Sequence, residues 1–142
     1  MSFLLDTNVL SELRKSPRSA SPAVRAWTAR HRPSDLYLST ITVMEVELGI
    51  CRVERRDPAQ GARLRSWLES EVLDAFAGRV LALDMAVGRR AARLHVPDPR
   101  PERDAMIAAT ASEHGMSVVT RNVKDFVPMD VPVINPWDHV DS

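Results

Sequence analysis

Short apolar runs alternate along the chain with stretches in which apolar residues recur every three or four positions. A run of about four apolar residues bounded by turn residues is typical of a buried strand. One run contains Pro132, which cannot donate to a sheet ladder, so its strand is expected at a sheet edge. The runs predict strands over residues 2–5, 36–39, 80–83, 117–120 and 131–134.

The stretches between the strands have the three- and four-residue apolar spacing of helices that pack on one face. Prolines suit first helical turns, and Gly78 and Gly115 follow two of the stretches as helix ends do. The predicted helices are one through Leu10 that is broken at Pro17, one from Pro22 to near Pro33, one from the N-cap Thr42 through Ile50, one from Pro58 to about Phe76, one over 84–95 and one over 105–113.

Alternation of strands and helices is typical of a parallel sheet with helices on both faces. We therefore predict a three-layer α/β/α fold with a mostly parallel sheet of four to five strands. Three prolines within residues 96–101 predict a loop. No repeat or long linker divides the chain, so residues 1–142 are expected to form one domain.

Composition narrows the class of protein. Hydrophobic residues make up 44% and charged residues 27%, ordinary values for a globular protein. The single Cys51 excludes an intramolecular disulfide, and we expect it to fill space on a helix. The first residues lack the basic and long apolar segments of a signal peptide, and no segment is long enough to span a membrane. We therefore expect a cytoplasmic protein without a membrane partner.

The net charge is zero, so the whole molecule has no basic field that would indicate a nucleic-acid partner. The cations are uneven, however: 17 are Arg and 2 are Lys. Arginine binds phosphates in bidentate fashion, although codon bias also explains this ratio. The cluster Arg52, Arg55 and Arg56 is a candidate phosphate contact.

Four carboxylates stand where predicted elements begin or end: Asp6, Glu45, Asp104 and Asp125. Asp6 directly follows the first strand, and Asp125 comes soon after the strand that ends at Thr120. The other two lie in predicted first turns of helices. Ligands of parallel sheets bind beyond the carboxyl ends of the strands, so this placement allows a single acidic pocket.

Such a pocket favours a bound cation. Two carboxylates about 4 Å apart repel by roughly 4 kcal/mol at an effective dielectric near 20. Oxygen ligands suit Mg²⁺ or Mn²⁺, whereas zinc prefers the His and Cys clusters that this chain lacks. A metal-activated water could then hydrolyse a phosphodiester without a Ser, Cys or His nucleophile. The resulting hypothesis is a metal-dependent phosphodiesterase.

Each carboxylate also has a structural explanation. Thr42 to Glu45 has the spacing of a capping box, in which the acid satisfies a backbone N–H. Asp104 suits the positive end of a helix dipole, and Asp125 could stabilise a turn. Asp98 competes with Asp104 but lies between two prolines. Asp6 is the hardest to explain structurally, because an acid after a buried strand needs a partner.

Taken together, the motifs resemble those of PIN-domain ribonucleases, specifically the VapC/FitB-type toxins of bacterial toxin–antitoxin pairs. The resemblance covers essentially the whole chain. Its motifs are Leu4–Glu12, Leu38–Gly49, Asp104–Ala111, Val119–Phe126 and the closing Val133–Trp137. The chain departs from the family pattern in the proline-rich segment 96–103, where relatives often have a more flexible stretch. We expect this difference to affect substrate entry.

The resemblance implies a role for each matching residue. The four acids match the metal-binding set for Mg²⁺ or Mn²⁺, and Asn8, Thr120 and Asn122 match the polar residues that support it. The implied activity is metal-dependent endonucleolytic cleavage of RNA, with tRNA among the candidate substrates. The implied assembly is a homodimer silenced by a cognate antitoxin protein, which would also mediate contact with operator DNA.

Two other functions remain open at this point. The same fold could be a non-catalytic module that binds RNA or protein, with the acids as helix caps. It could also be a receiver-type phosphoacceptor, which requires paired acids on the first strand and a late lysine. Lys124 is the only candidate lysine, and Asp6 has no acidic neighbour.

Overall fold

The computed structural model describes residues 1–141. All strand pairs are parallel, in the order β3-β2-β1-β4-β5, which confirms the predicted α/β class. The strand β5 lies at the edge, as Pro132 predicted. The strands are β1 (Phe3–Leu5), β2 (Leu36–Ser39), β3 (Val80–Leu81), β4 (Ser117–Val119) and β5 (Val133–Ile134).

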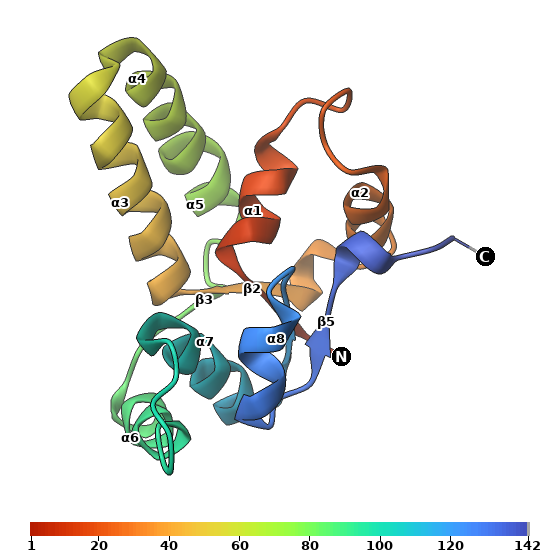
Figure 1. The fold of residues 1–142 in the computed structure, drawn as a ribbon. Coiled ribbons are helices and arrows are strands. Elements are labelled where there is room, and N and C mark those ends of the chain that lie inside the picture. The colour runs from red at the N-terminus through yellow and green to blue at the C-terminus, as the bar shows by residue number, and fades with distance from the viewer. Residues whose placement is uncertain (142) are drawn as a thin grey trace.

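Helices cover both faces of this sheet (Figure 1). One face carries α1, α2 and the long hairpin that begins with α3; the other carries α6, α7 and α8. The α-helices are α1 (Thr7–Arg14), α2 (Pro22–Ala29), α3 (Thr40–Arg56), α4 (Pro58–Trp67), α5 (Leu73–Ala75), α6 (Met85–Leu94), α7 (Glu102–Glu113) and α8 (Val123–Phe126). Shorter turns are η1 (Pro33–Asp35), the π-helical η2 (Leu68–Val72), η3 (Val127–Met129) and η4 (Pro136–Asp138).

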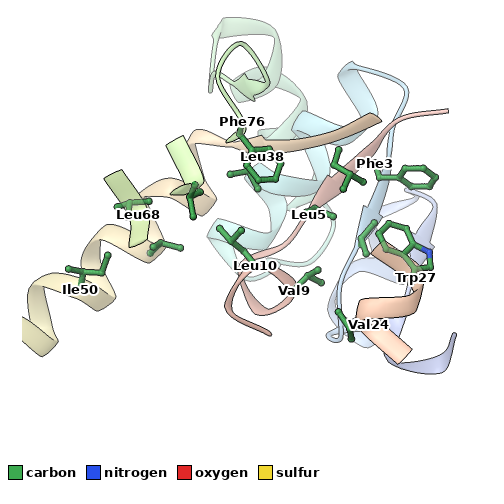
Figure 2. Close-up of a cluster of buried hydrophobic side chains, with 14 residues drawn as sticks. Phe3, Leu5, Val9, Leu10, Val24, Trp27, Leu38, Ile50, Leu68 and Phe76 are labelled. Carbon is green, nitrogen blue, oxygen red and sulfur yellow. The ribbon is translucent and has the colours of Figure 1, made fainter. Parts of the chain in front are cut away.

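The alternation of side chains along β1 divides the core between the two faces. Phe3 and Leu5 join the cluster formed with α1, α2, α3 and η2, which Figure 2 shows. Leu4, between them, joins the cluster formed with α7 and η3. All three residues of β1 are buried because the strand is central and covered on both sides. Trp137, in the closing segment, packs against the first cluster.

Several element boundaries differ from those predicted. The helix α3 begins at Thr40, because the side chain of Ser39 accepts a hydrogen bond from the Thr42 backbone N–H and acts as the cap. Thr42 is therefore not the N-cap. The helix predicted over 58–76 is interrupted by the π-turn η2, and α7 begins at Glu102, earlier than expected. Cys51 does lie on a helix, but it is exposed and fills no space in the core.

The connectivity of the sheet creates a switch point beside β1. The chain continues from β1 through β2 to β3 on one side, whereas β4 lies on the other side of β1. In sheets of this kind a crevice opens where the order reverses, beyond the carboxyl ends of the strands. Asp6 follows β1 and Thr120 follows β4, so both lie at this crevice. Within residues 1–141, no helix is long and apolar enough to cross a membrane.

Candidate metal centre

Asp6 occupies the end of the central strand and is buried, with 4% of its surface exposed. It also caps α1: its Oδ1 accepts the Thr7 backbone N–H at 2.8 Å. Its Oδ2 accepts the Thr120 hydroxyl at 2.7 Å and the Asn8 amide at 3.3 Å. These hydrogen bonds favour the charged form, but burial outweighs them and raises the pKa of Asp6.

Thr120 is held in one orientation by its neighbours. Its Oγ1 accepts the Asn8 side-chain amide at 3.3 Å and the Asn122 backbone N–H at 3.0 Å. Because both contacts use the oxygen as acceptor, its single proton is directed to Asp6. Asn8 in turn accepts the backbone N–H of Arg121 at 3.1 Å. Asn8 and Thr120 thus lie where the resemblance implied support, and Asn122 contributes through its backbone.

Glu45 lies in the second turn of α3, not in the first turn that the sequence suggested. The capping-box explanation for this residue is wrong, because Ser39 caps the helix. Its Oε1 instead accepts the hydroxyl of Thr7 at 2.7 Å. Its Oε2 lies 3.7 Å from Nη1 of Arg103, which is a loose, half-exposed ion pair. The helix therefore presents Glu45 to the residue that follows Asp6.

Asp104 and Asp125 complete the acidic group. Asp104 lies in the first turn of α7 and is half-buried; Asp125 is exposed on α8. The pKa of Asp104 is raised to about 6, first by burial and then, in decreasing order of effect, by the charges of Asp6, Asp125 and Glu45. The structure thus brings the other three predicted acids within electrostatic reach of Asp104. Asp98, the competing candidate, is exposed in the loop before α7.

The group has the chemistry of a divalent-cation site but not a closed ligand shell. Among residues 1–141, no three His, Cys, Asp or Glu side chains are arranged to hold a metal ion as they stand. The Glu45 carboxylate accepts a hydrogen bond from the Thr7 hydroxyl and lies beside the positively charged Arg103, so it is directed to these two residues. Burial and neighbouring negative charges raise the pKa of Asp6 and of Asp104, and the four acids form an all-oxygen donor set for Mg²⁺ or Mn²⁺. The residues therefore fit such an ion if side chains rotate or waters bridge.

Two contacts at the site were missed from the sequence. Thr7 links Asp6 to Glu45, since its backbone donates to one and its hydroxyl to the other. The sequence signal for Thr7 was its position between two candidate site residues, Asp6 and Asn8. Arg103 directly precedes Asp104 and supplies the cation nearest to Glu45. Nothing in the sequence pattern distinguished it from the other arginines.

The crevice at the switch point and its acids define the class of protein. Residues 3–129 match the PIN domain family, and the chain belongs to it. Membership of this family excludes the receiver-type phosphoacceptor. The chain is 39% identical to the VapC ribonuclease Y4jK of Sinorhizobium fredii, over 96% of this chain and 98% of that protein. It is also 39% identical to the toxin FitB of Neisseria gonorrhoeae, over 95% and 98% respectively.

Solved structures agree with the sequence comparison. The structure of FitAcB from Neisseria gonorrhoeae superposes with a TM-score of 0.87 and 36% identity, over 96% of this chain and 99% of that one. FitAB bound to the IR36 DNA fragment gives a TM-score of 0.86 and 35% identity, over 99% and 98%. The fold of this chain is thus shared with these relatives over nearly the whole length of both chains.

Proposed function

We infer that this protein is the toxin of a toxin–antitoxin pair and acts as a metal-dependent endoribonuclease. One observation carries the proposal: three acids from other elements lie within electrostatic reach of the half-buried Asp104, and burial together with their charges raises its pKa to about 6. A chain that keeps carboxylates in such proximity gains by binding a cation. The similarity to a VapC ribonuclease and to the toxin FitB supports RNA as the substrate.

Each residue has a proposed role at this site. Asp6 and Asp104 would be the main ligands of Mg²⁺ or Mn²⁺, and Glu45 and Asp125 would complete the set directly or through water. When bound there, the ion would supply a water of lowered pKa and neutralise charge on the phosphate. Thr120 and Asn8 fix the orientation of Asp6, and Thr7 fixes that of Glu45.

The proposed partners follow from the relatives. Solved structures of similar proteins include FitAcB, and FitAB bound to a DNA fragment. We therefore expect a cognate antitoxin protein that silences this chain, a homodimeric toxin, and operator DNA bound only through the antitoxin. The expected location is the cytoplasm, and tRNA is a candidate among the RNA substrates.

The test is cleavage of a whole-cell RNA pool by purified, antitoxin-free protein, with Mn²⁺ or with chelator. Discrete fragments that require both the metal and Asp6 would support the nuclease, and their ends would identify the target. Absence of cleavage with Mn²⁺ and also with Mg²⁺, from protein shown to be folded, would overturn the proposed activity.

The non-catalytic module remains a second candidate, because no three acids are arranged as ready ligands within residues 1–141. Isothermal titration with Mn²⁺ separates the two functions. The nuclease predicts Mn²⁺ binding that is lost in Asp104→Asn. Helix-capping acids predict no binding in either protein.

A further inference from the structure

An open pocket adjoins the acidic site, between α8 and the segment that leaves β5. Its volume is about 500 Å³. Asp125 belongs both to this pocket and to the group of acids that raises the pKa of Asp104, so the two spaces are neighbours. The lining residues are Arg121, Asn122, Val123, Lys124, Asp125, Asn135 and Asp138.

Arg121 is the best-positioned cation of this pocket. Its backbone N–H donates to Asn8, which also contacts Asp6. Its guanidinium carbon lies 4.9 Å from the centre of the Trp137 ring, within cation–π range. Trp137 itself packs against the hydrophobic core, so the ring is a fixed support. Both ends of Arg121 are therefore held relative to the acidic site.

The guanidinium nevertheless keeps its donors free. Three other arginines on folded elements are occupied: Arg65 contacts Glu47 and Glu54, Arg79 binds backbone carbonyls, and Arg90 contacts Glu113. Arg121 makes no ion pair and no side-chain hydrogen bond with any of residues 1–141. Stacking uses one face of the planar group and leaves its N–H edges available for a bidentate acceptor. An immobilised guanidinium with unused donors is suited to bind a phosphate.

We propose that Arg121 is a substrate-binding residue, which holds a backbone phosphate of single-stranded RNA in this pocket next to the phosphate that is cleaved. This inference rests on the proposed nuclease function and adds a subsite to it. Lys124 is a second, more flexible cation in the same pocket. The Trp137 ring serves as a positioning group, because it acts on RNA only through Arg121.

The two acids of the pocket, Asp125 and Asp138, would repel a bound phosphate. Asp125 is assigned to the metal, whose charge would offset its own. Asp138 is exposed on η4 and has no ion pair within residues 1–141. Its charge would weaken phosphate binding, so Asp138→Asn is expected to tighten RNA binding by about twofold.

The test compares Arg121→Ala, Arg121→Lys and the control Arg89→Ala. Arg89 is an exposed arginine on α6 and likewise has no ion pair within residues 1–141. RNA cleavage with Mn²⁺ should show KM raised about tenfold in Arg121→Ala, with kcat changed less than about threefold. Binding of a fluorescent single-stranded RNA of mixed sequence, in chelator and on an Asp6→Asn background, gives a second readout. Its logarithmic salt slope should fall by about 0.7 when one phosphate contact is lost.

Arg121→Lys should keep the salt slope and recover part of the affinity, because it retains a cation without the fork. Arg89→Ala should change neither quantity. An unchanged KM and salt slope in Arg121→Ala would overturn the subsite while leaving the nuclease intact. If wild-type protein cleaves no RNA, the nuclease fails separately. The binding slopes still decide whether Arg121 contacts a phosphate.

Discussion

Two groups of acids in this molecule have opposite electrostatic arrangements. In the first, between α3 and α4, Arg65 lies 2.7 Å from Glu47 and 2.7 Å from Glu54, with Glu69 at 3.6 Å. We call this group the Arg65 clasp. The second group is the acidic site, whose four carboxylates make a single, loose ion pair within residues 1–141, that of Glu45 with Arg103. Helix α3 carries acids of both groups, namely Glu45 and Glu47.

The pKa shifts follow from this difference. In the clasp, hydrogen bonds from Arg65 lower the pKa of Glu54. In the acidic site, burial and neighbouring negative charges raise the pKa of Asp104 to about 6. The fold therefore stabilises the charged form of Glu54 in the clasp and destabilises the charged form of Asp104 in the acidic site. The proposed cation would offset this cost at the acidic site.

The largest expected effect is on the rate of RNA cleavage, and it should distinguish Glu45 from Glu47, which lies on the same helix. Asp6→Asn and Glu45→Gln should each lower RNA cleavage by at least about 100-fold, beyond the roughly 10–100-fold typical of losing an outer-shell partner. Glu47→Gln, the matched control in the clasp, should cleave at the wild-type rate. Initial rates with Mn²⁺ measure this, and full activity in Asp6→Asn would end the site assignment.

The next effect is on stability and concerns the helix pair of the clasp. A Cβ at Gly61 of α4 would lie 2.6 Å from the Glu54 Cα and 2.9 Å from its backbone nitrogen. Gly61→Ala would therefore force the helices apart, at a cost of about 2 kcal/mol in the free energy of unfolding. Urea denaturation measures this cost, with Gly49→Ala as the control, because open space surrounds that glycine. Equal stabilities of the two variants would contradict this close approach.

A smaller effect of opposite sign is expected in the acidic site. The pKa of Asp104 rises from its ordinary value of 3.8 to about 6, so the fold disfavours its charged form. Asp104→Asn should then stabilise metal-free protein at pH 7 by about 1 kcal/mol, after allowance for solvent screening of a half-buried group. Thermal unfolding in chelator measures this gain.

The pH dependence of the free energy of unfolding tests independently whether the charge of Asp104 destabilises the fold. Between about pH 4 and pH 6 the folded state binds more protons at Asp104 than the unfolded state does. The contribution of this group to the free energy of unfolding therefore falls as the pH rises through this range. Asp104→Asn should lose that part of the pH dependence, and its gain over wild type should vanish near pH 4. A gain that persists at pH 4 would show that the charge is not responsible.

The sequence predicted the order of helices and strands well because short apolar runs bounded by turn residues are typical of buried strands. It also predicted Asp6, since a buried acid at a strand end requires partners. It placed Glu45 wrongly within its helix, because Ser39 and Thr42 are both good caps and only the tertiary position of β2 decides between them. The role of Thr7 depends on the approach of α3 to α1, which residues far apart in the sequence determine together.

The smallest expected effect would make the clasp resemble the acidic site. Arg65→Met keeps an apolar stem but leaves Glu47, Glu54 and Glu69 without their shared cation. Because these side chains keep 28–59% of their surface exposed, the loss of thermal stability should be small and should disappear at high salt. The pKa of Glu54, now lowered by Arg65, should rise, which titration by NMR can follow. RNA cleavage should be unchanged, because acids that lack a cation on the α3–α4 surface still lack the burial and the converging elements of the acidic site. A stability loss that salt does not reduce would mean that Arg65 acts through packing, and the contrast between the two groups would then be one of shape and not of charge.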